Sequence, residues 1–304
     1  MTISVGSLEV VALLDASGPF PVGRDEAFPD ATGEHWERAR RLDPGAFGGD
    51  RTWNLDFRCY AILDPRGGIT LVDTGVGPEG SPASEWAPGP GHLPDELRTA
   101  GVKPTAVDVV VLTHLHEDHR GWSVHLAGVP VFPNARYVVQ HDEVAALSDE
   151  DTAMRHVVAP LRDAGQLQEV DGEVLLTDSR DRLDQTITVL PTPGHTPGHQ
   201  SVLVTGGGSR SWSPVMSEAD QELARRSRTE LLARAGQERG LLATAHLTRP
   251  FVPACRGWRC AGRADGRPSS KCPLHGGAQA GVQVSGPGPV GAHLDDAHPM
   301  GGAE

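Results

Sequence analysis

The sequence predicts a mixed α+β fold, because segments patterned like strands occur together with segments patterned like helices. The clearest strand is 107–112, a nearly continuous β-branched run that is typical of a buried strand. The clearest helix is 217–236, with Leu223, Leu231 and Leu232 on its apolar side. With 304 residues, of which 38% are hydrophobic, the chain can bury a sizeable core in one large domain or two small ones.

The N-terminal part predicts strands interrupted by loops. Residues 1–15 contain two short extended runs, and 24–48 contain a helix within a loop, anchored by Trp36. Two further strands, 53–63 and 69–72, flank a Gly-rich turn and therefore predict a hairpin.

The rest of the chain predicts an alternation of helices and strands. The expected elements are a loop at 76–92, a helix at 94–101, a strand at 135–140 leading into a helix at 141–147, a helix at 153–164, strands at 187–190 and 201–204, and a strand at 241–244.

Composition and charge exclude several classes of protein. The net charge of −13 disfavours binding to phosphate backbones, so we expect no nucleic-acid partner. No apolar run approaches the ~18 residues of a membrane span, and the N-terminus has no secretory signal. Because the chain has only four cysteines and no such signal, we expect a cytoplasmic protein without a disulfide framework.

The last fifty residues have a different character. Residues 255–304 contain eleven glycines and five prolines without apolar periodicity. We therefore expect one domain over 1–253 and a disordered tail over 254–304. The tail also carries a weak zinc-like pattern, Cys255, Cys260, Cys272 and His275. An alternative is that the tail is a frameshifted or divergent C-terminus, because out-of-frame translation of GC-rich DNA yields such a composition.

The strongest chemical signal directly follows the strand at 107–112. His114, His116, Asp118 and His119 fall within six residues. Alternate residues after a strand point the same way, so His114 and His116 can bind one metal while Asp118 and His119 bind a neighbouring one. Imidazole and carboxylate are ligands that zinc prefers in open catalytic sites.

Two further histidines lie at positions where they can complete these sites. His195 is in a Pro- and Gly-rich turn between two expected strands, and His246 follows the strand at 241–244. His199, in the same turn, is interpreted as structural. The remaining candidates, His125, His141 and His156, have no motif around them and are interpreted as ordinary histidines.

This set of motifs, with Leu71-Val-Asp-Thr-Gly75 before it, resembles the metallo-β-lactamase superfamily over residues 1–253. The similarity is greater to its lactonases and general hydrolases than to its antibiotic-degrading members. It implies a four-layer αβ/βα sandwich with the site at one edge. It also implies the following roles: a first zinc on His114, His116 and His195, a second on Asp118, His119 and His246, and Asp73 as an outer carboxylate that fixes a ligand histidine.

The resemblance implies a zinc-dependent hydrolase acting on a small-molecule substrate. A metal-bound hydroxide would attack an ester, lactone or thioester carbonyl, and Asp118 would orient it and assist proton transfer. The same ligands suit iron or manganese, so a mononuclear iron dioxygenase of the same fold is an alternative.

The chain departs from the family pattern after the turn. The family places a bridging Asp in a Gly-Asp pair at a strand end, whereas here 201–205 runs into Gly206-Gly-Gly-Ser-Arg. We therefore expect one strand to be absent, the first zinc to bind tightly and the second weakly. Asp220 is the nearest carboxylate, but its setting is that of a helix start. An impaired family member that binds one metal or none is the remaining alternative.

Overall fold

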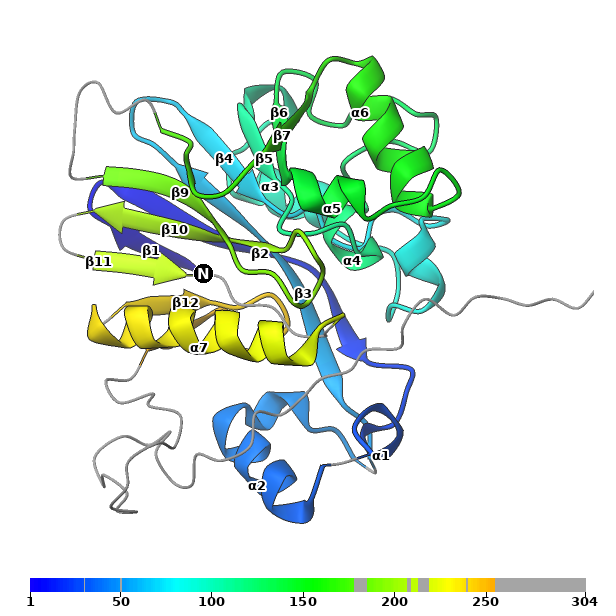
Figure 1. The fold of residues 1–304 in the computed structure, drawn as a ribbon, viewed down its shortest axis with the longest axis vertical. Coiled ribbons are helices and arrows are strands. Elements are labelled where there is room, and N and C mark those ends of the chain that lie inside the picture. Colours follow the sequence, from blue (N-terminus) through cyan, green and yellow to red (C-terminus); the bar gives the residue numbers. More distant parts are fainter. Residues whose placement is uncertain are drawn as a thin grey trace, which may run out of the picture.

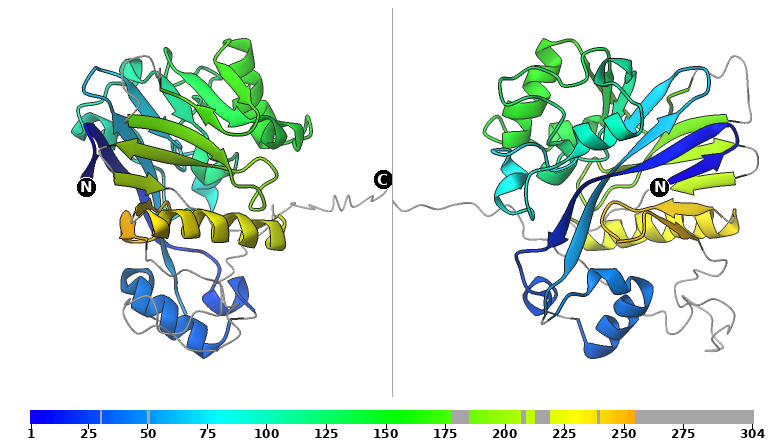
Figure 2. Two further views of the ribbon diagram at one scale, coloured as in Figure 1. Left: turned by 60° about the vertical axis from the view of Figure 1, so that its left-hand side comes forward. Right: turned by 180° about the vertical axis from the view of Figure 1, so that it is seen from behind.

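The computed structural model describes residues 1–254 except 30, 50, 178–184, 207–208, 213–218 and 239. Two β-sheets pack face to face, with helices on their outer sides (Figures 1 and 2). This arrangement confirms the predicted four-layer αβ/βα sandwich. The C-terminal tail and its Cys255, Cys260, Cys272 and His275 pattern lie outside the described residues.

The first sheet has seven strands in sequential order from β1 to β7. Pairing is antiparallel from β1 to β4 and parallel from β4 to β7, so the carboxyl ends of β4, β5, β6 and β7 share one edge. The strands are β1 (Thr2–Val5), β2 (Leu8–Pro19), β3 (Asn54–Leu63), β4 (Ile69–Val72), β5 (Val109–Val111), β6 (Arg136–Gln140) and β7 (Leu167–Val170).

The second sheet has six described strands in the order β13-β12-β11-β10-β9-β8. All its pairs are antiparallel except β11 with β12. The strands are β8 (Val174–Leu175), β9 (Gln185–Pro191), β10 (Gln200–Gly206), β11 (Ser209–Trp212), β12 (Leu241–Ala243) and β13 (Phe251–Pro253).

The alternation of side chains along the strands builds the core. In β3, Tyr60 and Ile62 face the second sheet, while Cys59 and Ala61 face the helices on the other side. This period of two lets each inner strand contribute to two apolar layers at once. Burial of both faces explains why the inner strand β5 is a continuous apolar run.

The helices complete the outer layers. The helices α3 (Leu93–Thr99), α5 (His141–Ala145) and α6 (Ala159–Asp163), with the π-helix Met154–Val158, cover the first sheet. The helix α7 (Gln221–Gln237) covers the second sheet through Leu231 and Ala235 (Figure 1).

Short helices near the sheet ends pack against a cluster that holds much of the aromatic content. The helices α1 (Arg24–Ala27) and α2 (Gly33–Leu42) pack with an aromatic cluster that includes Trp36, as predicted for that loop. The other short helices are α4 (Glu117–Arg120) and the 3₁₀ turns Pro44–Ala46, Pro82–Glu85 and Pro104–Ala106.

The structure corrects the expectation that a strand is missing. The strand β11 (Ser209–Trp212) follows β10 and joins it to β12. Its sequence, Ser-Arg-Ser-Trp, has no apolar run, so hydrophobic patterning gave no signal for it. The polar β7 and the two-residue β8 were not predicted either, and α7 begins at Gln221 rather than 217. Within the described residues, no helix is long and apolar enough to cross a membrane.

Candidate metal centre

The candidate site lies at the edge of the sandwich where several strands end. Because β4 and β5 are parallel neighbours, Asp73 after β4 and the segment from Thr113 after β5 emerge side by side. The turn between β9 and β10 carries His195, and the chain reaches His246 shortly after β12. Segments far apart in the sequence therefore converge because the sheets fix where each strand ends.

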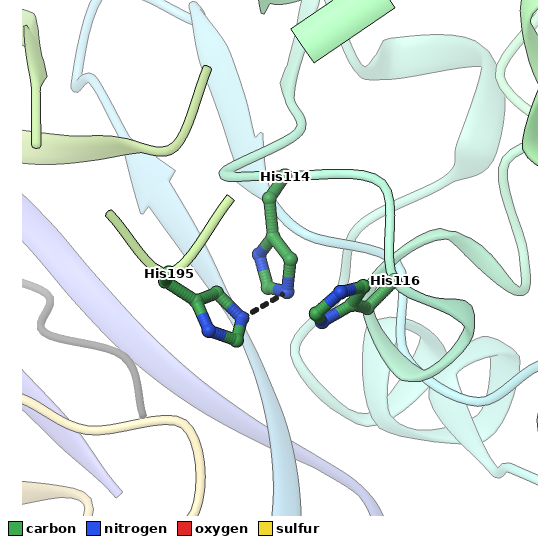
Figure 3. Close-up of side chains that lie close together, drawn as sticks. All are labelled: His114, His116 and His195. Carbon is green, nitrogen blue, oxygen red and sulfur yellow. Dashed lines mark hydrogen bonds between the residues drawn. The ribbon is translucent and has the colours of Figure 1, made fainter. Parts of the chain in front are cut away.

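The first group consists of His114, His116 and His195. Their rings converge in Figure 3, and one ring nitrogen of each lies within 4.8 Å of the others. The Nε2 atoms of His114 and His195 are 2.9 Å apart. His114 and His195 are buried, while His116 is exposed at the rim.

The two buried imidazoles of this group are held in the neutral form. Burial, reinforced by neighbouring histidines, lowers the pKa of His114 well below its usual value. Burial and the nearby His116 and His199 lower the pKa of His195 in the same direction. Neutral imidazole is the form that binds a metal, so these nitrogens are in the required state at neutral pH.

The second group consists of Asp118, His119 and His246. The Nε2 atoms of His119 and His246 are 3.3 Å apart, and Asp118 Oδ2 lies 3.3 Å from the first and 3.6 Å from the second. The ring centroids of His114 and His119 are 4.1 Å apart, so the two groups are immediate neighbours.

Charge distinguishes this group from the first. Burial alone would lower the pKa of His119, but Asp118 and Asp73 raise it to about 10. In turn, His119 and His246 hold the pKa of Asp118 well below its usual range, although burial alone would raise it. Without a metal, His119 is therefore a cation between two carboxylates.

Asp73 connects the two groups through hydrogen bonds. Its Oδ2 accepts from His119 Nδ1 at 2.8 Å, and its Oδ1 accepts from the Thr113 amide at 2.8 Å. The Thr113 hydroxyl donates to Asp73, so it accepts from His114 Nδ1 at 3.1 Å. Asp73 holds this position with a φ of 59°, a conformation that is uncommon outside glycine and recurs at functional sites.

His246 has a comparable support. Its Nδ1–H donates to the Asp56 carbonyl at 3.1 Å. The buried Arg58 pairs with the Asp56 carboxylate and donates to the carbonyls of Leu247 and Thr248. In His114, His119 and His246 the Nδ1 atom is therefore engaged, which leaves Nε2 facing the site.

The helix α7 packs against the turn that carries His195. The backbone amides of Ala219 and Asp220 donate to the carbonyls of His195 and Gly194. Gly194 has a φ of +125°, and a Cβ there would lie 2.1 Å from the Ala224 nitrogen. The Asp220 side chain accepts from the Leu223 amide as the helix N-cap and is exposed, which agrees with a helix start rather than a ligand role.

The remaining histidines lie outside both groups. His199 is buried, its Nδ1 lies 2.8 Å from Thr192 Oγ1, and burial lowers its pKa to about 3. This placement agrees with a structural interpretation. His125, His141 and His156 are exposed.

The donor sets fit a divalent transition metal. Ligands about 2 Å from one zinc lie within about 4 Å of each other, and the nitrogen and oxygen atoms of each group are close to that spacing. Three imidazoles, or two with a carboxylate, are ligand sets that such metals accept. Among the described residues, Asp118 is the single carboxylate in the two groups, and it belongs to the second.

The six residues predicted as metal ligands are the ones that the structure brings together in these two groups, with Asp73 beside them, but the residues that support them were not predicted. Thr113, Arg58 and a buried glutamate, Glu143, were not singled out. Each acts through hydrogen bonds that the folded structure creates. None of them belongs to a spaced pattern of metal-binding residue types, so hydrogen-bond partners could not be inferred from the sequence. The motif carried a signal for the donors alone.

Comparison with known proteins agrees with this geometry. The sequence matches the Metallo-beta-lactamase superfamily over residues 58–208. That range includes Asp73 and five of the six donors of the two groups, and only His246 lies beyond it. This part of the chain belongs to the metallo-β-lactamase superfamily.

Individual relatives support the same assignment. The chain is 30% identical to an N-acyl homoserine lactonase of Bacillus cereus over 165 residues, which are 50% of this chain and 59% of that enzyme. A hydrolase of the same superfamily, AbOPH, superposes with a TM-score of 0.65 at 23% identity, over 83% of this chain and 91% of the other. AidC, described as a dizinc quorum-quenching lactonase, gives 0.63 at 20% identity, over 82% and 91%. These two structures show a shared fold.

Proposed function

We propose that this protein is a metal-dependent hydrolase that cleaves an ester, lactone or thioester bond in a small molecule. The main support is the pair of adjacent donor groups, His114, His116 and His195 beside Asp118, His119 and His246, within a metallo-β-lactamase superfamily domain. Because relatives at about 30% identity are named N-acyl homoserine lactonases, a lactone is the first substrate to test.

The metal we propose is zinc, and the ligand set also suits manganese or iron. A bound divalent metal lowers the pKa of a water to about 7 and polarises a carbonyl oxygen. Asp118 is ionised, and its carboxylate faces both His119 and His246. An ionised carboxylate accepts hydrogen bonds, so Asp118 would orient an attacking water toward the substrate.

The surroundings of the second group favour a substrate with an apolar part. The Phe57 ring lies 5.5 Å from the His246 ring and 5.9 Å from the Trp86 ring. The Trp86 indole donates to Glu117 Oε2 at 2.9 Å, which fixes the ring next to the ligand segment. The Phe57 ring is buried and supports Trp86 from below, so the partly exposed Trp86 is the ring that would pack against an acyl chain.

A one-metal protein without turnover is the second candidate. It is favoured by the donor set of the described residues, in which Asp118 of the second group is the single carboxylate and none is placed between the two groups. Two dications held close together repel each other, and a bridging carboxylate offsets that repulsion. A mononuclear iron dioxygenase is a related alternative, because three imidazoles alone also suit iron.

Elemental analysis together with turnover distinguishes these functions. The protein would be stripped of metal, reloaded with zinc, manganese or iron, and assayed with N-hexanoyl homoserine lactone and a nitrophenyl ester. We expect lactone opening that depends on zinc and is absent in His116→Ala but present in His141→Ala. One bound zinc with no hydrolysis would favour the one-metal protein, and oxygen consumption with iron and a persulfide would favour the dioxygenase.

A further inference from the structure

A buried carboxylate lies between the two segments that carry the first histidine group. Glu143 is on α5, directly after β6, and its side chain is buried. Its Oε1 accepts from the Leu115 amide at 2.8 Å, and its Oε2 accepts from the Gly198 amide at 3.1 Å. One side chain therefore binds the backbone of two segments that are distant in the sequence.

Both contacts are made next to candidate metal ligands. Leu115 lies between His114 and His116, and Gly198 lies three residues after His195. A carboxylate that accepts two backbone amides with separate oxygens fixes the distance between the two segments. The group formed by the three histidines depends on that distance.

The packing of the turn on α5 supports this role. A Cβ on Gly198 would lie 2.1 Å from the Glu143 backbone nitrogen and 2.5 Å from its Cβ. The turn therefore rests directly on the backbone of α5, and Gly198 has no side chain because the space is filled by Glu143. The backbone of α5 and the Glu143 carboxylate therefore together support the turn that carries His195.

A second link joins the same segments on the other side of His114. The Gln200 amide donates to the Thr113 carbonyl at 2.8 Å, and its side chain donates to the Leu112 carbonyl at 2.9 Å. Hydrogen bonds therefore fix the chain on both sides of His114. Gln200 contacts the residues that precede His114, and Glu143 contacts the residue that follows it. Rotation of the His195 turn relative to His114 would break at least one of these contacts.

We propose that Glu143 is a positioning residue that sets the geometry of the first metal site without contacting the metal. This inference rests on the proposed metal-binding function. Outer partners of metal ligands typically change metal affinity by about 10- to 100-fold when they are removed. Glu143 would act on three ligands at once, because it holds both segments from which they come.

The test is the zinc affinity of each site in Glu143→Gln, measured by competition with a chromogenic chelator. Glutamine has the same size but only one acceptor oxygen, so one of the two amides faces an NH₂ group. We expect the tighter site to weaken about 10- to 100-fold and the other by less than about threefold. The absorption spectrum of the cobalt-loaded first site should also change.

Two controls separate positioning from general destabilisation. Asp142 is the preceding residue on α5 and is exposed, so Asp142→Asn should leave both affinities unchanged. Asp15 is a buried carboxylate that accepts from the Val76 and Leu93 amides, outside both ligand segments of the first group. Asp15→Asn should lower the melting temperature of the metal-free protein without weakening the tighter site.

The outcomes distinguish this inference from the proposed function. If the wild type binds no metal tightly, the proposed function fails. If the wild type binds zinc and Glu143→Gln binds it equally well at both sites, the positioning role is wrong. Should Glu143→Gln fail to fold, Glu143→Asp keeps the charge but is too short to reach both amides. An unchanged tighter-site affinity in Glu143→Asp would overturn the inference equally.

Discussion

The two histidine groups lie side by side but differ in charge. In the first, burial keeps His114 and His195 neutral, so their nitrogens are ready to bind a metal. In the second, His119 lies between Asp73 and Asp118, and its pKa is raised to about 10. A metal entering the second group must displace a proton from His119, whereas one entering the first need not.

The difference shows that two sites with similar ligand types can differ in how readily they bind a metal. Each group has three donors from the same region of the fold, yet the carboxylates around His119 stabilise a proton where a metal would bind. Among the described residues, Asp118 of the second group is also the single carboxylate in the two groups, which leaves two neighbouring dications poorly compensated. We therefore expect the first site to fill before the second.

The largest effect is expected from removing a ligand of the first group. His116→Ala should weaken tight zinc binding by more than the factor of about 100 that can follow loss of an outer partner. Because His116 is exposed, the metal-free protein should keep its melting temperature. Equal zinc content in His116→Ala and His141→Ala, measured by elemental analysis, would refute the assignment of His116.

Asp15 is a buried carboxylate that lies outside both histidine groups. Burial raises its pKa from 3.8 to about 6, although amides of Val76 and Leu93 oppose the shift. The folded state thus binds a proton more tightly than the unfolded state. The resulting stabilisation is complete below pH 3.8 and is lost as the pH rises through about 6.

The stability difference between wild type and Asp15→Asn measures this effect. Between pH 7 and pH 4 it should shift in favour of the wild type by up to about 3 kcal/mol. Denaturant unfolding of both metal-free proteins across that range provides the measurement. A difference that does not change with pH would show that the Asp15 carboxylate is ionised at a normal pKa.

A substitution of Asp73 measures how far zinc binding at the second group depends on the neighbouring carboxylates. Asp73→Asn removes the acceptor of His119 Nδ1 while an amide oxygen can still accept from the Thr113 amide. We expect the weaker site to lose about 10- to 100-fold in zinc affinity, and the tighter site to lose less. Chelator competition would contradict the proposed separation if the two sites weakened equally.

The smallest effect is expected from the C-terminal tail. Ala254 is buried in the apolar cluster that includes Leu231 and Ala235 of α7, and its amide donates to the Gly240 carbonyl at 2.9 Å. A truncation that keeps these contacts therefore ends after Ala254 rather than after Pro253. From their composition, we expect residues 255–304 to bury too little apolar area to offset chain entropy. Deleting them should change the melting temperature by only a few degrees. A large loss of stability would renew interest in Cys255, Cys260, Cys272 and His275 as a zinc site.

The sequence was sufficient where residue spacing encodes geometry. The β-branched run before His114 and the Gly-rich turn around His195 predicted both the strands and the donors, because strand ends determine where those side chains emerge. It was insufficient where a single polar residue acts through contacts that form only in the folded structure. Glu143 has no neighbouring motif, and Ser209–Trp212 pairs as a strand although its sequence has no apolar run.

The unequal affinity of the two metal sites is tested most directly by a zinc titration of the metal-free wild type at pH 7.5 with a competing chelator. We expect two binding events whose dissociation constants differ by at least about tenfold, the tighter lost in His116→Ala and the weaker lost in His246→Ala. Two equally tight sites would contradict this expectation, and would mean that another carboxylate compensates the second metal.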